Sequence, residues 1–244
     1  MKIENIPNIY QAGDQAVIVV FEETISPEIN LQVHSLKTTI ENYGFEEIIE
    51  LVPGYASLLV GYDTNLVSSE EIRAKILGIL SNGIDLKISS GRVIEIPVLY
   101  GGKHGPDLDE IADKANIQTA DLIQMHSAEE YLVYMIAFTP GFPYLGGLNK
   151  KLEAKRLATA RTKVPAGSVG IAGLQTGIYP IESSGGWRLI GRTPLRLFDP
   201  YLDSPFLLAP GDYVKFKPID GSDEFQEIEE QVRIMDYKPK VISR

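Results

Sequence analysis

The stretch between Thr139 and Pro194 most constrains the fold, because it carries ten of the chain's 22 glycines. Glycine and proline interrupt it every few residues, so helical periodicity is absent. Between them stand short runs rich in aliphatic residues, such as SVGIAG, GIYPI and WRLIGRTPLRLF. Closely spaced short strands with glycine and proline at the turns are typical of compact barrels and sandwiches. The stretch therefore predicts a β-barrel or sandwich rather than a layered α/β sheet.

The segments around this stretch complete a domain expected at residues 91–244. RVIEIPVLY and YLVYMIAF predict strands, and PGDYVKFKPI predicts a closing strand. Two short helices are expected at 107–115 and 119–126, and SDEFQEIEEQV predicts an acidic amphipathic helix. The last residues, DYKPKVISR, are expected to be a frayed tail.

Residues 1–90 show a different alternation of strand and helix periods. Ser26 and Pro27 begin a helix that Gly44 ends, and a capping box of Ser68 and Glu71 begins a second helix. Strands are expected in QAVIVVFEE, EEIIELV, ASLLVGY and IDLKISS. The order β-α-β-β-α-β is that of ferredoxin-like domains. The expected fold class is therefore α+β, with a ferredoxin-like N-terminal domain followed by a β-barrel.

Charge and composition narrow the function classes. The 23 basic and 33 acidic residues give a net charge of −10, which argues against a nucleic acid or an anionic membrane as partner. The absence of cysteine excludes disulfides and thiolate chemistry and suits a reducing cytoplasm. The N-terminal residues lack the apolar core of a signal peptide, and the uncharged stretches are too short for a membrane span.

The segment from Val164 to Trp187 is the most unusual, because Glu182 is its only charged residue. Its dense glycines either allow sharp barrel corners or let backbone N–H groups approach a ligand. Glycines 167, 170 and 173 match neither the dinucleotide fingerprint nor a Walker A loop, and Ser168 is not in a nucleophile elbow. Both interpretations of the glycines remain open.

Basic residues border this uncharged block, with Arg161 and Lys163 before it and Arg188, Arg192 and Arg196 after it. In an acidic chain such a cluster could bind a carboxylate or phosphoryl group. The alternative is ordinary surface charge on alternate strand positions. His126, at the end of a helix, could cap helix carbonyls or act as a general acid or base, and no histidine pair has metal-ligand spacing.

The chain resembles a family that carries three labels: allophanate hydrolase subunit 1, sporulation kinase inhibitor, and the B-type subunit of 5-oxoprolinase. The resemblance rests on His126 with YLVYMIAF, and on FTPGFPYLGGL, RTKVPAGSVGIAGLQTGIYPI, GGWRLIGRTPLRLFD and PGDYVKF, in that order. It implies that the barrel is cyclophilin-like. It also implies an ATP-dependent 5-oxoprolinase that opens 5-oxo-L-proline to L-glutamate, using ATP with Mg²⁺.

The same resemblance implies two partners and an isolated chain without activity. The partners are a homologue of subunit 2, which is the C-type subunit of 5-oxoprolinase, and a LamB/YcsF-like subunit. On this view the apolar loop FTPGFPYLGGL packs against the barrel or a partner. The residues expected at that interface are Phe138, Pro140, Phe142, Pro143 and Tyr144.

The implied reaction needs groups that bind anions and groups that orient the substrate or move protons. The first role is expected for Arg161, Lys163 and Arg192, with Gly167, Ser168, Gly170 and Gly173 offering backbone N–H donors. The second role is expected for His126, Gln175 and Tyr179. No metal ligands are assigned.

Three alternatives stay open at this stage. The family name implies that the chain could inhibit a sensor histidine kinase, and the older label implies an allophanate or urea amide hydrolase. The barrel type alone suggests a prolyl isomerase, although a fold does not fix a function.

Overall fold

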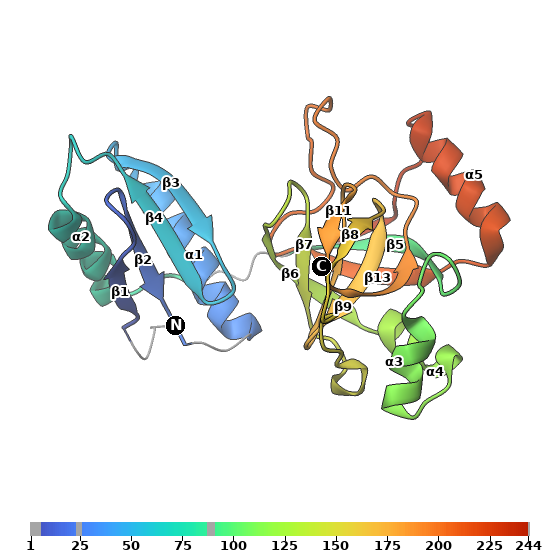
Figure 1. Cartoon of the computed structure of the whole chain (residues 1–244). Coiled ribbons are helices and arrows are strands. Elements are labelled where there is room, and N and C mark those ends of the chain that lie inside the picture. Colours follow the sequence, from blue (N-terminus) through green and yellow to red (C-terminus); the bar gives the residue numbers. More distant parts are fainter. Residues whose placement is uncertain (1–5, 23–25, 87–90, 244) are drawn as a thin grey trace. The chain divides into compact units, whose positions relative to one another are not determined.

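The computed structural model describes residues 6–22, 26–86 and 91–243, and the chain divides into two compact units, Met1–Ser89 and Ser90–Arg244 (Figure 1). Each unit has its own hydrophobic core. None of the helices within the described ranges has the length and apolar content that a membrane crossing requires.

The N-terminal unit is a four-stranded antiparallel sheet with two helices packed against one face. Its core joins buried residues of the sheet, such as Val17, Val19 and Leu58, to Leu36 and Ile76 of the helices. The strands lie in the order β1-β2-β4-β3. The elements are β1 (Asn8–Gln11), β2 (Ala16–Val20), α1 (Pro27–Tyr43), β3 (Ile48–Pro53), β4 (Ser57–Tyr62) and α2 (Ser69–Asn82).

Both helices begin and end as the sequence predicts. The Ser26 side chain accepts a hydrogen bond from the backbone of Ile29, and Gly44 ends α1 at a left-handed φ of 64°. Ser68 and Glu71 form the expected reciprocal capping box at the start of α2. These ends are local, since side-chain caps and glycine stops act within one turn.

The edge strand of this sheet corrects one expectation. Residues 84–86, the start of IDLKISS, are not in a strand, and residues 87–90 lie outside the described residues. The place next to β2 that a ferredoxin-like plan gives to its last strand is taken by β1, with Ile9 paired to Val19. β1 was not predicted, because four residues that alternate poorly give little signal.

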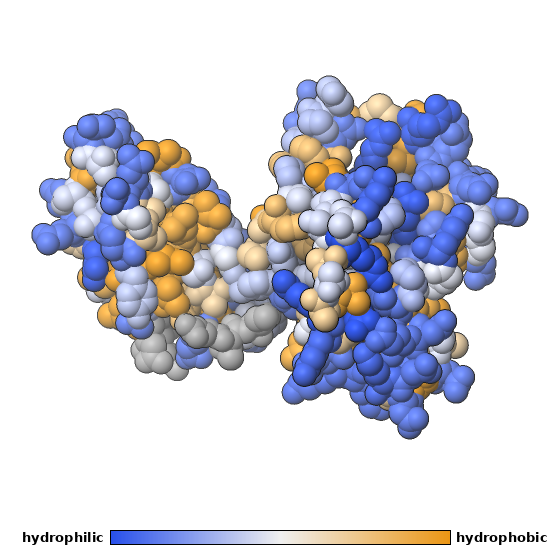
Figure 2. Space-filling view, in the orientation of Figure 1, coloured by the Kyte–Doolittle hydropathy of each residue, from blue (hydrophilic) through white to orange (hydrophobic). Residues whose placement is uncertain are grey.

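The other face of this sheet is covered by no described element of its own unit. Strand alternation directs Tyr10, Ile18 and Leu59 to that face, and Tyr10 and Val52 are largely exposed. Figure 2 shows apolar residues gathered over the strands of this unit.

The C-terminal unit is built on a closed barrel of seven strands in the order β12-β9-β10-β7-β6-β13-β5, and pairing of β12 with β5 closes the ring. All neighbours are antiparallel except β13 and β5. The ring strands are β5 (Arg92–Tyr100), β6 (Glu130–Ile136), β7 (Pro143–Gly146), β9 (Ser168–Ala172), β10 (Gln175–Ile178), β12 (Arg188–Arg192) and β13 (Tyr213–Pro218). The predicted α+β class with a barrel is confirmed.

Additional elements surround the ring. The helices α3 (Leu108–Ala115), α4 (Thr119–Ala128) and α5 (Gly221–Arg233) form where the sequence predicts them. A 3₁₀ turn, η1 (Lys150–Leu152), and a separate two-stranded sheet of β8 (Arg161–Val164) and β11 (Ser183–Gly185) complete the wall.

The expected frayed tail is wrong, because Val241–Ser243 forms strand β14 on the edge of β5. β12 pairs with β5 only at Leu99 and Tyr100, which leaves the first residues of β5 available on that edge. β14 pairs there, with Val241 opposite Ile94. Backbone pairing of a buried strand thus orders a segment whose own composition predicts no structure.

Candidate functional site

Four aromatic side chains pack together on the outside of the barrel, and we call them the aromatic face: Phe142, Tyr144, Tyr179 and Trp187. The rings of Tyr144, Tyr179 and Trp187 all lie within 6 Å of another ring in the group, mostly edge to face. Such contacts are favourable beyond the apolar area that they bury. Burial raises the pKa of the Tyr179 hydroxyl, so this phenol stays protonated near neutral pH.

The glycines of the wall make room for these rings. A Cβ on Gly177 would lie 3.0 Å from Trp187 and 3.1 Å from Phe142, and one on Gly170 would lie 3.1 Å from Trp187. A Cβ on Gly185 would come within 2.2 Å of the Tyr179 hydroxyl oxygen. The glycine density of this stretch is therefore explained first by close packing of aromatic rings against a bare backbone.

The backbone donors expected from residues 167–173 are already used. The N–H of Gly167 donates to the Tyr179 carbonyl at 2.7 Å, and that of Gly173 donates to the Ala154 carbonyl at 2.7 Å. The Ser168 amide donates to Pro165, and Gly170 lies in β9, which is paired on both edges. The structure therefore gives these glycines a packing role, and we do not assign anion binding to their amides.

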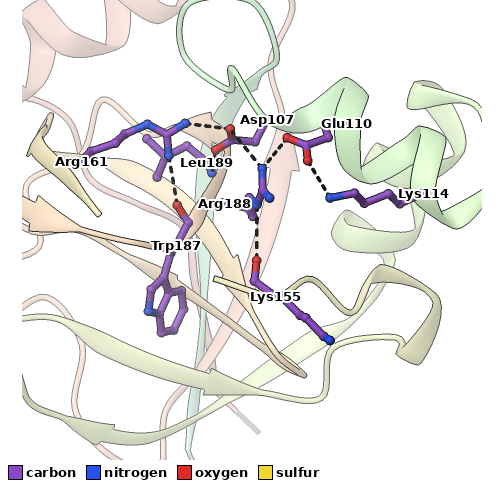
Figure 3. Close-up of polar contacts among 8 residues, drawn as sticks. All are labelled: Asp107, Glu110, Lys114, Lys155, Arg161, Trp187, Arg188 and Leu189. Carbon is purple, nitrogen blue, oxygen red and sulfur yellow. Dashed lines mark hydrogen bonds and ion pairs between the residues drawn. The ribbon is translucent and has the colours of Figure 1, made fainter. Parts of the chain in front are cut away.

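A carboxylate that the sequence reasoning missed ties the predicted cations to the fold (Figure 3). Asp107, at the start of α3, is 6% exposed, accepts from Arg161 at 2.7 Å and accepts from the Leu189 amide at 2.6 Å. Arg161 also donates to the Trp187 carbonyl at 3.3 Å. Arg188 pairs with Glu110 and donates to the Lys155 carbonyl. We call this set the Asp107 network, and it holds α3, β8 and β12 together.

The other predicted cations do not join Arg161 in one cluster. Lys163 pairs with Glu182 at 3.1 Å, and Arg196 pairs with Asp199 at 3.1 Å. Arg192 lies under α5, 3.9 Å from Glu229. Among the contacts of the described residues, none links Arg161 or Lys163 with Arg192. The cluster expected from the sequence is thus divided between at least two places on the barrel.

Arg156 is the cation that lies over the aromatic face. Its guanidinium carbon is 5.9 Å from the centre of the Trp187 ring, a cation–π distance. Burial raises the pKa of Tyr144 and of Tyr179, and the positive charge of Arg156 opposes this shift by lowering both. Within the described part of the chain, Arg156 has no carboxylate partner. It is therefore the arginine here whose charge is available to a ligand.

Gln175 brings an amide to the same face. It stands two residues before Gly177 in β10, so strand alternation directs both toward the aromatic rings. The Gln175 Nε2 atom is buried and has no hydrogen-bond partner among the described residues. A buried donor without an acceptor is costly, and such groups are often completed by a ligand.

His126 lies in the barrel interior and is 0% exposed. The Thr176 hydroxyl gives its one hydrogen to the Gly170 carbonyl, so it accepts from His126 Nε2 at 2.9 Å. His126 Nδ1 then accepts from the Tyr100 hydroxyl at 2.8 Å. Both ring nitrogens are bonded to side chains, so the imidazole does not cap helix carbonyls. The ring is buried, so in this conformation no substrate can reach it to exchange a proton. His126 is a buried neutral residue that packs on Phe216.

The burial of His126 predicts an acid-sensitive barrel. Burial lowers its pKa from 6.5 to about 3. Below pH 6.5 His126 is therefore protonated in the unfolded chain but stays neutral in the folded chain. The free energy of unfolding falls as the pH falls. Between pH 7 and pH 5 this residue should cost about 2 kcal/mol of unfolding free energy. Urea titrations of the wild type and His126→Gln, followed by Trp187 fluorescence, measure the difference, since all other groups are shared. Equal losses in the two proteins would contradict this prediction.

The apolar loop that was expected at a partner interface divides into two parts. Phe142 and Pro143 are buried, and Phe142 belongs to the aromatic face. Phe138 is 59% exposed and Pro140 is also exposed. Phe138 has a left-handed φ of 67°, which is rare for a bulky residue and marks local strain. The exposed pair is available to a second polypeptide, and Tyr144, which lies in ring strand β7 rather than in a loop, is half-buried.

No metal site emerges from the described residues, since they contain no group of three or more histidine, aspartate or glutamate side chains able to hold an ion. Sequence reasoning did not assign roles to Asp107, Glu110 or Arg156. Asp107 stands immediately before a predicted helix, and Glu110 follows it by one turn, but neither position reveals its distant arginine partner.

The chain matches a known domain family over most of its length. A model of the carboxyltransferase domain, subdomains C and D, matches residues 7–208, and the chain belongs to this family. The B-type subunit of the Bacillus subtilis 5-oxoprolinase is 43% identical over 225 residues, which cover 88% of this chain and 94% of the relative. The family resemblance drawn from the sequence is confirmed.

Three further proteins are similar to this chain in sequence or in fold. A conserved uncharacterized protein of Pyrococcus horikoshii has a crystal structure that matches with a TM-score of 0.54 at 49% identity, over 89% of this chain and all of that chain. The urea amidolyase of Lachancea kluyveri is 24% identical over 86% of this chain and 13% of its own length. The urea carboxylase of Kluyveromyces lactis shares the fold, with a TM-score of 0.84 at 22% identity, over the whole of this chain and 24% of its own.

Proposed function

We propose that the chain is one polypeptide of an ATP-dependent 5-oxoprolinase that opens 5-oxo-L-proline to L-glutamate in the cytoplasm. Its partners would be a subunit 2 (C-type) homologue and a LamB/YcsF-like subunit. The supporting observation is the 43% identity to the B-type subunit of the B. subtilis enzyme across nearly the full length of both chains. Under this proposal residues 1–90 form a domain that departs from the ferredoxin-like order by the β1 edge strand, residues 91–244 form a cyclophilin-like domain, and the chain is inactive alone.

The chemistry of a lactam explains why such an enzyme needs ATP. An amide carbonyl is a poor electrophile, and ATP with Mg²⁺ supplies a phosphoryl group that activates its oxygen. A protein surface must then bind the substrate carboxylate, donate a hydrogen bond to the amide oxygen and admit the one water molecule that attacks the activated carbon as phosphate leaves. The proposal requires these groups on one face.

The aromatic face offers groups of these kinds. Arg156 lies over Trp187 and would bind the substrate carboxylate with two N–H donors. The unpartnered Nε2 of Gln175 would donate to the amide oxygen. Tyr144 and the exposed Phe138 would pack on the five-membered ring. Because Arg161 is bound to Asp107, we assign it to the support of this face.

Reconstitution tests the proposed reaction. The chain, its two proposed partners and all pairwise mixtures are incubated with 5-oxo-L-proline, ATP and Mg²⁺, and glutamate is measured. Glutamate should form only when all three polypeptides are present. Complete mixtures that assemble but form no glutamate would overturn the proposal.

Removing the Gln175 amide should lower the turnover of the reconstituted complex by about 100-fold, as loss of an oxyanion donor does in other enzymes. The reason is that no other donor replaces the Nε2 group at the amide oxygen. Gln175→Ala is compared with Gln124→Ala, which changes an exposed glutamine of α4 and should keep full turnover. Similar turnover for both variants would remove Gln175 from the site.

A second candidate function is the hydrolysis of an open-chain amide, such as urea or allophanate. The urea amidolyase relative favours it, although at 24% identity. Offering urea and allophanate to the same complex separates the two reactions. The kinase-inhibitor alternative stays a prediction, tested by titrating a histidine kinase with the chain.

A further inference from the structure

A row of apolar side chains crosses the N-terminal sheet on the face opposite α1 and α2. The strand register pairs Tyr10 with Ile18 and Ile18 with Leu59, and it pairs Leu59 with Val52. Each of the four residues stands next to a residue of the helix-side core in sequence, so strand alternation directs it to the other side. We call this row the outer sheet face.

The central strands have the composition of strands that are covered on both sides. β2 reads AVIVV, without a polar residue, and β4 has Leu58, Leu59 and Val60 in succession. A strand with one face in water alternates apolar and polar residues, whereas a strand buried on both faces is a nearly continuous apolar run. Yet Tyr10 and Val52, at the two edges of the row, are 54% and 46% exposed. The sequence of these strands thus indicates a second cover, which no described element of this unit supplies.

The dimensions of the outer sheet face suit one helix. The row crosses three inter-strand spacings, or about 14 Å, and a strand of the length of β2 extends about 17 Å. A helix is about 10 Å wide, and three of its turns are about 16 Å long. On the opposite face, α1 and α2 already pack against the alternate residues of the same strands. A helix on the outer face would give the sheet the same kind of layer on both sides.

The charged groups on the sheet side of this unit are acidic. Glu50 of β3 lies opposite Gly61, where an added Cβ would come within 2.8 Å of the Glu50 Cγ atom. Asp14, in the turn between β1 and β2, and Glu22, directly after β2, are exposed at the rim. The four strands and the turns within the β1–β2 and β3–β4 pairs contain neither lysine nor arginine. The basic residues in the described part of the unit are all on the helices: Lys37, Arg73 and Lys75.

Most of the net charge of the chain belongs to this unit. Met1–Ser89 carries 13 acidic and five basic residues, which is −8 of the total of −10. A second copy of the chain would bring an equally acidic rim against this face, and like charges disfavour such an association. A partner with lysine or arginine beside its apolar residues would be attracted instead. Charge complementarity therefore selects a basic occupant over a second copy.

We propose that the outer sheet face binds a basic amphipathic helix of another polypeptide. The apolar side of the helix packs on Ile18 and Leu59, and its lysine or arginine side chains lie beside Glu50. Tyr10 and Val52 contact the flanks of the helix at the edge strands. The proposal rests on the N-terminal unit alone and does not depend on the proposed 5-oxoprolinase reaction.

Titration of the full chain with a defined peptide tests the proposal. The probe is a labelled helical peptide of about 18 leucine and lysine residues with all leucines on one side, and binding is followed by fluorescence anisotropy. We expect saturable one-to-one binding. The double variant Tyr10→Gln/Val52→Gln should bind at least tenfold more weakly, because apolar contact is lost without a change of charge. Leu77→Gln makes a matched change at a residue of α2 that is 40% exposed, and it should bind as the wild type does.

A second pair of variants tests the charge. Glu50→Gln should weaken binding several-fold at low salt, since it removes the carboxylate on the outer sheet face. Glu70→Gln removes an exposed carboxylate of α2 and should leave the affinity unchanged. A peptide with glutamate in place of every lysine should not bind. Thermal melts of all variants show that they are folded.

Three results would overturn the proposal. The first is the same affinity for the double variant and Leu77→Gln. The second is equally tight binding of a permuted peptide whose leucines are spread around the helix. The third is a chain that sediments as a dimer and becomes monomeric in the double variant, because a second copy would then occupy the face. No reaction is measured in these experiments, so their failure and the failure of the proposed reaction are distinguishable.

Discussion

Replacing Asp107 with alanine should lower the free energy of unfolding of the barrel unit by about 3 kcal/mol. The change leaves Arg161, whose side chain is 28% exposed, without its carboxylate, and it leaves the Leu189 amide without an acceptor. Breaking a buried pair from one side costs more than the pair contributes, since the remaining charge stays desolvated. Urea denaturation followed by fluorescence measures the loss, because Trp187 is the only tryptophan and lies in this unit.

Glu110→Gln is the matched control for this prediction. Glu110 belongs to the same network but its side chain is 46% exposed, so its pairs with Arg188 and Lys114 are open to solvent. Its loss should cost less than about 1 kcal/mol. If the two variants were equally stable, the Asp107 network would not hold α3 to the barrel.

Replacing Gly167 with alanine should destabilise the barrel by more than about 3 kcal/mol, from strain and overpacking together. Gly167 has a left-handed φ of 82°, and an added Cβ would lie 2.1 Å from the Thr193 carbonyl oxygen. That oxygen is backbone and cannot move aside, because Thr193 itself donates to the Gly167 carbonyl at 2.9 Å. Urea denaturation monitored at Trp187 measures this loss also.

Gly173→Ala separates backbone strain from overpacking. Gly173 also has a left-handed φ, 59°, but nothing lies within 4 Å of its added Cβ. Its replacement should cost about 1 to 2 kcal/mol from strain alone. A loss as large as that of Gly167→Ala would show that contact with Thr193 is not the cause.

The parts of the fold that the sequence predicts well are those that depend on neighbours in the chain. Ser26, Gly44 and the pair of Ser68 and Glu71 each act within one helical turn, so the ends of α1 and α2 follow from local pattern. The glycine-rich stretch likewise predicts a barrel, because glycine and proline mark the turns between its short strands. The two short strands β1 and β14 were missed, since each is ordered by a partner strand rather than by its own residues.

The candidate site was harder to predict because its members are joined by distant contacts. The arginines lie near one another along the chain, which suggested one cluster. In the structure Arg161 instead binds Asp107, 54 residues away in sequence, and Arg192 pairs with Glu229 of α5. His126 had the residue type of a proton carrier, and only the closed barrel shows that it is buried. Gln175 and Tyr179 were named from chemistry, and the structure places them at or beside the same aromatic rings.

The ratio of ADP released to glutamate formed tests the central claim most directly. In the complex that we propose, of this chain with a subunit 2 homologue and a LamB/YcsF-like subunit, we expect ADP release that depends on 5-oxo-L-proline, with one ADP for each glutamate. A rate of ATP hydrolysis that is the same with and without 5-oxo-L-proline, or glutamate formed without ATP, would contradict the account.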